Sequence, residues 1–441
     1  APLAYGHFAI GAKGAPEAVM ELCGLDAAER RRWERRVHAM AACGLRVLAV
    51  ASAHWHGPSW PATQRGFRYR LAGLLGLIDP PRQEARAAVA ECHAAGIRVL
   101  MMTGDHEVTA RAVAGQVGLS ASPRSITGAE VDALDDEQLA ARLADVDVCA
   151  RVQPTQKLRL VRALQRRGEV VGMTGDGVND APALKAADAG VAMGGRGTDV
   201  AREAAALVLL DDDFASLVAA IRQGRRIYDN IMTATRFVVA VHVPVVALAL
   251  LPSLLHWPIL MMPVQIALLQ LLIDPACSIV FEAAPAAPRI MCRPPRPIGE
   301  SPFRMANLGL GAVQGAGLAV ILALCYGSLL VMPGSAELAR GITFLGLVGG
   351  VLLLTVANHQ VALPLWRIAW GKNPWLLRML GAGVLMLAAV LGIAPLRAAI
   401  GLEGLDGKAL ALLLSLVLAG AAWLEAVRRV LRRWRPLLME S

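Results

Sequence analysis

The second half of this chain contains apolar runs that are long enough to decide its fold class. No charged residue occurs between Arg236 and Asp274, and comparable stretches follow up to the C-terminal tail. A helix needs about 20 apolar residues to cross the hydrocarbon core of a bilayer. We therefore expect residues 216–441 to form an all-α transmembrane bundle of six helices, at about 233–252, 259–281, 307–331, 341–364, 379–396 and 409–425.

Basic residues gather in the loops on one side of these six segments. They are Arg289, Arg293, Arg296 and Arg304 after the second segment, Arg367, Lys372 and Arg378 after the fourth, and Arg428, Arg429, Arg432, Arg433 and Arg435 in the tail. Loops rich in arginine and lysine stay on the cytoplasmic side. We therefore interpret the formal net charge of +9 as membrane topology and contact with the lipid bilayer, and we expect no nucleic acid partner. The chain is predicted to be a multi-pass protein of the cell (plasma) membrane with its soluble part in the cytoplasm.

Two carboxylates occur within the second apolar segment. Asp274 lies in its middle and Glu282 at its end, and Pro275 removes a backbone hydrogen bond beside Asp274. Charged groups inside a membrane are costly and usually functional, so Asp274 is a candidate cation ligand. Glu282 is either a second ligand or a residue at the membrane interface. His242, with Pro244 close by on the first segment, is a weaker candidate of the same kind.

Residues 70–215 alternate strand-like apolar runs with amphipathic helices, as a parallel α/β sheet does. One expected strand, 96–102, runs into Thr103-Gly104-Asp105, and a second, 169–173, runs into Thr174-Gly175-Asp176. Sites in such sheets lie beyond the carboxyl ends of the strands. Both Thr-Gly-Asp loops are therefore expected to converge on one site.

The second loop continues as Gly177-Val178-Asn179-Asp180. Its glycines permit a tight turn, and the oxygen atoms of Asp176, Asn179 and Asp180 suit Mg2+ beside a phosphate. Lys157, at the start of the preceding helix, is placed to pair with a phosphoryl group, and Thr103 to donate its hydroxyl to the same group.

Taken together, these strings resemble the P-type (E1–E2) cation-transporting ATPases of the calcium and proton pump branches. The resemblance covers nearly the whole chain and is carried by Met173–Lys185, Lys13–Glu17, Gly44–Ala49, Asp79–Arg82, Gly197–Glu203 and Asp229–Ile231. It implies that residues 1–70 are the C-terminal part of an α+β nucleotide-binding domain. Residues 71–215 would then be a haloacid-dehalogenase-like (Rossmann-like) phosphorylation domain that lacks its nucleophile segment.

The resemblance also implies roles for single residues, with ATP and Mg2+ as the cofactors. Thr103, Gly104, Asp105 and Lys157 would hold the transferred phosphoryl group, and Asp176 would bind Mg2+ with Asn179 and Asp180 beside it. Lys13, Gly14 and Arg46 would contact ATP, with Arg82 as a further contact. In the membrane, the family's ion-binding positions fall on Gln270, Asp274 and His242.

Two departures from the family bear on activity. The phosphorylated aspartate of the family lies in Asp-Lys-Thr-Gly-Thr, a string that these residues do not contain. We therefore expect a C-terminal portion of a pump that forms no phosphoenzyme alone, and whose partner is a separately encoded or missing N-terminal half with the actuator domain and the first four helices. Compared with the calcium pumps, the Asn and Thr ligand positions of the sixth helix become Gln270 and Ile273, and the Asn and Glu positions of the fifth become His242 and Val245. The loss of these oxygen ligands argues against a standard calcium site, so Asp274 would serve a proton or a monovalent ion.

Two other functions agree with parts of the sequence. A membrane-anchored phosphatase of the same soluble fold would need a nucleophilic aspartate of its own, and none is apparent. A non-catalytic membrane subunit, or one half of a split pump, agrees with the missing string, but the intact Asp176 loop argues against decay.

Overall fold

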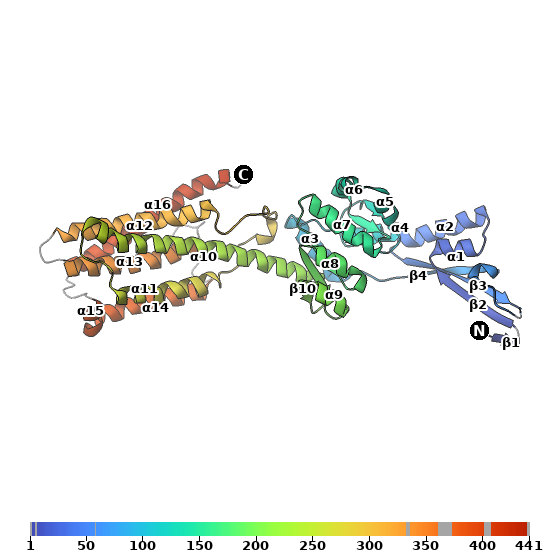
Figure 1. Ribbon diagram of the computed structural model, residues 1–441, viewed down its shortest axis with the longest axis horizontal. Coiled ribbons are helices and arrows are strands. Elements are labelled where there is room, and N and C mark those ends of the chain that lie inside the picture. Colours follow the sequence, from blue (N-terminus) through green and yellow to red (C-terminus); the bar gives the residue numbers. More distant parts are fainter. Residues whose placement is uncertain are drawn as a thin grey trace. The chain divides into compact units, whose positions relative to one another are not determined.

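The computed structural model describes residues 2–4, 7–57, 59–331, 336–359, 373–400 and 407–438. The chain divides into two compact units, Ala1–Ile221 with Met291–Ile298, and Arg222–Ile290 with Gly299–Ser441. Figure 1 shows both units and labels their helices and some of their strands.

The first unit begins with an antiparallel sheet. Its strands follow the order β1 (Pro2–Ala4), β2 (His7–Gly14), β3 (Arg46–Trp55) and β4 (Arg70–Leu77). Between β2 and β3 lie α1 (Pro16–Leu22) and α2 (Ala27–Ala42), and the 3-10 turn Gln64–Gly66 precedes β4. The small side chains of Ala49, Ala51 and Ala53 form the buried face and share a core with Val19 of α1. Since β4 pairs with β3, this sheet continues to Leu77, beyond residue 70; the division into domains stays a prediction.

The rest of the first unit contains two parallel sheets of three strands each. One has the order β5-β7-β6, formed by β5 (Met101–Met102), β6 (Ser125–Thr127) and β7 (Val148–Ala150). The other has the order β10-β9-β8, formed by β8 (Gly172–Gly175), β9 (Ala189–Met193) and β10 (Leu207–Leu209). Their helices are α3 (Gln83–Ala94), α4 (Glu107–Gln116), α5 (Gly128–Ala133), α6 (Asp136–Arg142), α7 (Pro154–Arg166), α8 (Ala181–Ala186) and α9 (Asp199–Ala204). The predicted α/β class is confirmed.

The two strands that were expected to end at the Thr-Gly-Asp loops are shorter than predicted. The expected strand 96–102 is reduced to Met101–Met102, and the expected strand 169–173 begins only at Gly172. Both β5 and β8 end their sheets, so each has a paired neighbour on one side only. Even so, Met102 and Met173 belong to one hydrophobic cluster, which continues from one sheet to the other. Residues 96–102 and 169–173 are strand-like in sequence, but part of each segment does not pair with a neighbouring strand among the described residues.

The second unit confirms the six membrane helices. They are α10 (Phe214–Leu255), α11 (Pro263–Pro275), α12 (Met305–Leu330), α13 (Ala336–His359), α14 (Pro374–Gly392) and α16 (Gly407–Leu438). A π-helix, Ala276–Phe281, extends α11, and each of the six, counted with that extension, is long and apolar enough to cross a membrane. The short helix α15 (Ala394–Ile400) follows α14.

Several predicted ends differ from the observed ones. The first helix begins at Phe214 rather than near 233, because its polar first turns are helical too. The second begins at Pro263 rather than 259, since a proline is tolerated at the first helical position. The fifth ends at Gly392 rather than 396. Residues 360–364 of the predicted fourth helix, with Arg367 and Lys372, lie outside the described residues.

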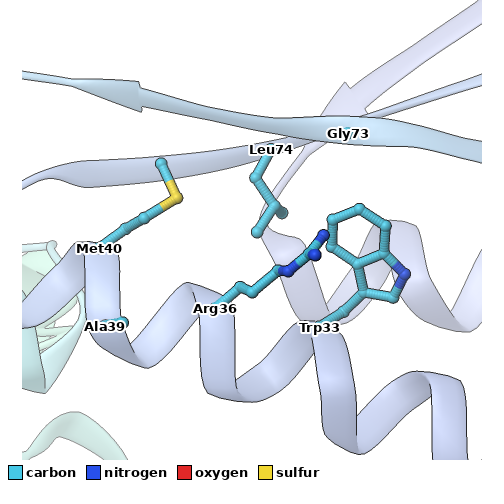
Figure 2. Close-up of a pocket in the computed structure, with 6 residues that line it drawn as sticks. All are labelled: Trp33, Arg36, Ala39, Met40, Gly73 and Leu74. Atoms are coloured by element: carbon cyan, nitrogen blue, oxygen red, sulfur yellow. The ribbon is translucent and has the colours of Figure 1, made fainter.

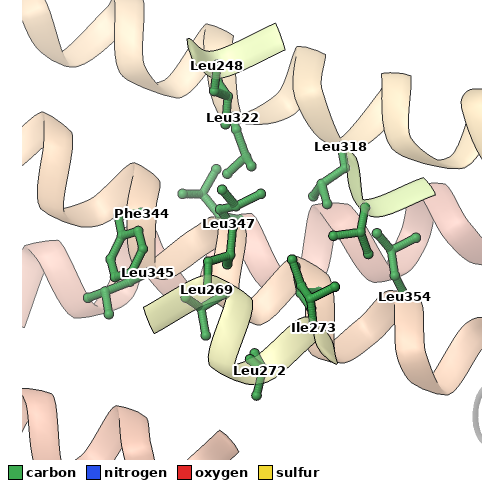
Figure 3. Packing of buried hydrophobic residues seen from close by; sticks show 14 of the residues in the cluster. Leu248, Leu269, Leu272, Ile273, Leu318, Leu322, Phe344, Leu345, Leu347 and Leu354 are labelled. Carbon is green, nitrogen blue, oxygen red and sulfur yellow. The ribbon is translucent and has the colours of Figure 1, made fainter. Parts of the chain in front are cut away.

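Leucine is the most frequent residue in the buried core of the membrane unit. Figure 3 shows the side chains of Leu269 and Ile273 on α11 directed toward Leu318 and Leu322 of α12 and toward Leu347 of α13. Glycines let two helices approach closely. A Cβ atom added at Gly315 of α12 would lie 2.4 Å from the carbonyl oxygen of Ala240 on α10, whereas one added at Gly309 would meet nothing within 4 Å.

This difference makes Gly315 and Gly309 a matched pair for a stability test. We predict that Gly315→Ala lowers the unfolding free energy by about 1–3 kcal/mol, because the added methyl group forces α12 away from α10. Gly309→Ala should leave it unchanged or raise it by up to about 1 kcal/mol through helix propensity. Thermal unfolding of the detergent-solubilised chain measures both, and equal effects of the two substitutions would contradict this packing.

Candidate functional site

The loop after β8 folds back on Asp180. A Cβ atom at Gly175 would lie 2.7 Å from the Cβ of Asp180, so this approach requires glycine. The amide of Gly177 donates to Asp180 Oδ2 at 3.3 Å, and the 3-10 turn Val178–Asp180 leads directly into α8. Only 6% of Asp180 is exposed. The loop therefore buries one of its two carboxylates.

The buried carboxylate is paired with Lys157 of α7. Lys157 Nζ lies 2.6 Å from Asp180 Oδ1, and the two side chains are 21% and 9% exposed. A buried carboxylate without a partner is strongly destabilising, so the lysine is required for this loop conformation. The sequence predicted Lys157 as a partner of a phosphoryl group; in the structure it is held by Asp180 at the same loop.

The other carboxylate, that of Asp176, is exposed together with Asn179. No hydrogen bond holds the Asp176 carboxylate within the described part of the chain, and no group of three or more His, Cys, Asp or Glu side chains there is placed to hold a metal. Proteins commonly bind Mg2+ through one or two carboxylates, while phosphate and water complete the shell. Asp176 fits such an ion, provided that the other ligands come from phosphate and water.

The first Thr-Gly-Asp loop is fixed to the end of β7. The amide of Thr103 donates to the carbonyl of Cys149 at 2.9 Å, and the amide of Val152 donates to the carbonyl of Thr103 at 3.1 Å. The Thr103 hydroxyl lies 3.1 Å from Asp105 Oδ2, and Gly104 is exposed. Across the described residues, no hydrogen bond or ion pair joins this loop to the Asp176 loop, so their convergence stays a prediction.

Burial excludes one nearby group from nucleophilic chemistry. It raises the pKa of the Cys149 thiol to about 12. The thiolate is the reactive form of cysteine, so Cys149 stays an inert thiol at neutral pH.

A cleft of about 340 Å³ separates the antiparallel sheet from the Thr103 loop. It is lined on one side by Glu17 and Arg46, and on the other by Asp105, His106 and Arg151. Arg46 Nε lies 3.8 Å from Asp105 Oδ1, and Arg151 donates to Glu17. Burial, together with the charge of Arg151, lowers the pKa of His106. Cationic side chains therefore stand at both walls of the cleft.

Neither Glu17 nor Arg151 was predicted from the sequence as a site residue on its own. Arg151 follows β7 directly and has a left-handed backbone, with φ of 53°. Its place at the carboxyl end of a parallel strand is the signal that could have identified it.

Only some of the residues that were predicted to bind ATP lie on the same face of the sheet. Lys13 pairs with Val50 across β2 and β3, and Arg46 lies four residues before Val50, so Lys13 and Arg46 share one face of the sheet. Gly14 ends the same strand, β2. Arg82, at the start of α3, instead acts on Asp211. The pKa of Asp211 is lowered, mainly because Ser216 donates a hydrogen bond to its carboxylate, and the positive charge of Arg82 lowers it further.

A second groove, of about 450 Å³, lies between α2 and β4. Figure 2 shows the Arg36 guanidinium over the Trp33 ring, at 4.9 Å from the centroid, facing Leu74. No predicted site residue lines it.

The predicted ion ligands lie on α10 and on α11 with its π-helical extension, which Glu282 follows directly. In the described part of the chain, no hydrogen bond or ion pair joins their side chains to one another. Gln270 and Asp274 are exposed on α11, and the hydroxyl of Ser278 donates to the Asp274 carbonyl at 2.7 Å where the π-helix begins. His242 Nδ1 lies 2.8 Å from the carbonyl of Val238 on its own helix. The side chain of Glu282 is exposed, and its carbonyl accepts a hydrogen bond from Asn230 at 3.0 Å. Pro275 thus does not unwind the helix; it changes the helix from α to π.

Comparison with known proteins gives consistent matches over both units. The family of the cation-transporting ATPase C-terminus matches residues 258–430, and that of the haloacid dehalogenase-like hydrolases matches residues 26–188. The chain is 39% identical over 326 residues to a calcium-transporting ATPase of Bacillus subtilis. The matched region covers 70% of this chain and 36% of the relative.

Two further relatives agree. A probable cation-transporting ATPase F of Mycobacterium tuberculosis is 42% identical over 65% of this chain and 33% of its own length. Calcium-transporting ATPase type 2C member 1 of Homo sapiens is 39% identical over 64% of this chain and 31% of its own. The chain thus spans about a third of the length of these curated relatives.

The Lys157–Asp180 pair generates a stability prediction. Lys157→Met should lower the unfolding free energy by about 1–3 kcal/mol, because it leaves a buried carboxylate without its partner. Lys185→Met, which removes an exposed lysine of α8, is the matched control and should change it by less than about 0.5 kcal/mol. Thermal unfolding of the purified chain measures both variants. Equal stability of the two would show that the pair does not support the loop.

Proposed function

Because this chain belongs to the P-type cation-transporting ATPases and corresponds to their C-terminal region, we propose that it is the C-terminal portion of an ATP-driven cation pump. In this proposal, Mg2+-dependent formation and hydrolysis of an aspartyl phosphate is coupled to ion movement across a membrane. The observation that carries the proposal is the loop after β8, with Asp176 exposed and Asp180 held by Lys157.

In this proposal, different residues of the two loops and of α7 bind Mg2+, bind the phosphoryl group or position a neighbouring side chain. Asp176 would hold Mg2+, which would neutralise negative charge on the phosphate. Lys157, Thr103, Gly104 and Asp105 would bind and orient the transferred group, with Asn179 beside the metal. Asp180 fixes Lys157 through their 2.6 Å ion pair. Its role in the proposal is therefore to position the lysine.

Lys13 and Arg46 would bind ATP from the sheet face that they share, with Gly14 at the strand end. Arg46 is exposed, and its ion pair with Asp105 spans 3.8 Å. Exposed pairs of this kind contribute little to stability. Arg46 can therefore leave Asp105 for a phosphate at low cost. Arg82, whose charge also acts on Asp211, is proposed as a further contact of the nucleotide.

The nucleophilic carboxylate is proposed to come from a further strand between β5 and β8. Each of these strands ends its sheet, and the apolar cluster continues beneath both. A strand that paired with both β5 and β8 would join the two sheets into one sheet of seven strands. Its carboxyl end would lie beside the Thr103 and Asp176 loops, since parallel strands end at the same edge. This strand would belong to the proposed N-terminal partner half.

The transported cation is proposed to bind at Asp274, with Gln270, His242 and Glu282 as nearby polar groups. Asp274 is exposed on a helix that can cross a membrane. An ionised carboxylate facing lipid would be costly, so we propose that helices of the partner half cover this face. Relatives named as calcium-transporting make Ca2+ the first ion to test, and a proton or a monovalent ion is the alternative that Gln270 and His242 favour.

Nucleotide binding by the purified chain tests the proposal. We expect a fluorescent ATP analogue to bind and to be displaced by ATP. Lys13→Ala and Arg46→Ala should each raise its dissociation constant about tenfold, the loss of one charge-assisted contact. Arg31→Ala, on exposed α2 surface, is the control and should bind as the unaltered chain does.

No displacement by ATP would contradict the proposal and favour a non-catalytic membrane subunit. Displacement by inorganic phosphate but not by ATP would favour the membrane-anchored phosphatase.

A further inference from the structure

The carboxylate of Asp212 holds a glycine-rich loop. Asp212 is 9% exposed and has a left-handed backbone, with φ of 54°. Its Oδ1 accepts a hydrogen bond from the amide of Gly195, and its Oδ2 accepts one from the amide of Arg196, each at 2.9 Å. A residue that keeps an uncommon backbone conformation is held there by its surroundings. Both carboxylate oxygens of Asp212 are therefore committed to one loop, 194–198.

This loop is in turn bonded to the main chain of Asp176. The amide of Thr198 donates to the carbonyl of Asp176 at 2.9 Å. At its other end, the amide of Gly194 donates to the carbonyl of Leu209 at 2.8 Å. The loop 194–198 thus links the Asp212 carboxylate to the main chain of Asp176, the residue that is proposed to hold Mg2+.

Close packing restricts the backbone conformation of the loop 194–198. A Cβ atom at Gly197 would lie 1.9 Å from the carbonyl oxygen of Met193, and one at Gly195 would lie 3.0 Å from Asp212 Oδ2. The guanidinium of Arg202 donates to the carbonyls of Gly194 and Gly197. The amides and the carbonyls of the loop are thus both held by charged side chains.

We propose that Asp212 is a positioning residue for the Mg2+ site: it holds the loop 194–198 against Asp176 and so fixes the direction in which the Asp176 carboxylate points. This inference rests on the proposed function, in which Asp176 binds Mg2+. Residues that orient a metal ligand commonly change metal affinity 10- to 100-fold when they are replaced.

The neighbouring Asp213 serves a different structure and provides a matched control. Its Oδ1 accepts a hydrogen bond from the amide of Ala215 at 2.9 Å, in the first turn of α10. Within the described part of the chain, no hydrogen bond or ion pair joins Asp213 to the loop 194–198. Replacing Asp213 removes the same charge from the adjacent position without touching the loop.

The test is the binding of Mn2+ to the full chain in detergent at saturating inorganic phosphate, measured by water-proton relaxation. Asp212→Asn keeps the side-chain volume and tolerates the left-handed backbone, but its NH2 group cannot accept from an amide. We expect Asp212→Asn to weaken Mn2+ binding about tenfold. Asp213→Asn should bind as the unaltered chain does, and Asp176→Asn should lose binding. Thermal unfolding of each variant accompanies the titrations.

Equal affinities for Asp212→Asn and Asp213→Asn, with binding lost only in Asp176→Asn, would overturn the inference and leave the proposed Mg2+ site standing. Unchanged binding in Asp176→Asn would overturn both. Conversely, a loss specific to Asp212→Asn in a chain that unfolds at the same temperature as the control would support the positioning role.

Hydrogen–deuterium exchange on the unaltered chain keeps the inference testable if Asp212→Asn does not fold. Coupling between two sites is reciprocal, so Mg2+ should slow the exchange of the Gly195, Arg196 and Thr198 amides. Exchange at these amides that is unaffected by saturating Mg2+ would overturn the positioning role.

Discussion

The proposed function of the α/β part depends on the edges of β5 and β8, each of which has a paired strand on one side only among the described residues. Strand edges are normally paired, covered or protected by charge. Here the segments before β5 and β8 are strand-like in sequence, yet only Met101–Met102 and Gly172–Gly175 are strands. Val170, just before β8, is 68% exposed. The same two strands lead into the loops of Thr103 and Asp176, so a strand that paired with both would reach the two proposed phosphate-binding loops at once.

Charge is distributed within the Asp176 loop so that one carboxylate supports the structure and the other stays available. Asp180 is buried and neutralised by Lys157, and Asp176 is exposed. The acidic run Asp211-Asp212-Asp213 follows the same division: Asp212 holds the loop beside Asp176, and Asp211 and Asp213 accept hydrogen bonds at the start of α10. Because α10 continues as one helix of 42 residues to Leu255, the chain passes directly from this site to the segment that carries His242.

How much could be predicted from the sequence depended on whether the deciding interactions are local. The six membrane helices follow from hydropathy, because lipid requires every backbone group in the membrane to be satisfied within the helix. The start of α10 at Phe214 was missed, since its first turns are polar and hydropathy detects only the apolar part. The lengths of β5 and β8 could not be predicted, because they depend on a neighbouring strand rather than on their own residues. Likewise, the ion pair of Lys157 with Asp180 and that of Arg151 with Glu17 join residues far apart in sequence, and no spacing rule identifies them.

Phosphoenzyme formation tests the central claim most directly. Membranes containing this chain, with or without a co-expressed N-terminal half that carries Asp-Lys-Thr-Gly-Thr, would be incubated with Mg2+ and ATP labelled at the γ-phosphate. We expect acid-stable label only when both halves are present, and we expect its loss when this chain carries Asp176→Ala. Label on this chain alone, or no label with both halves present and folded, would contradict it.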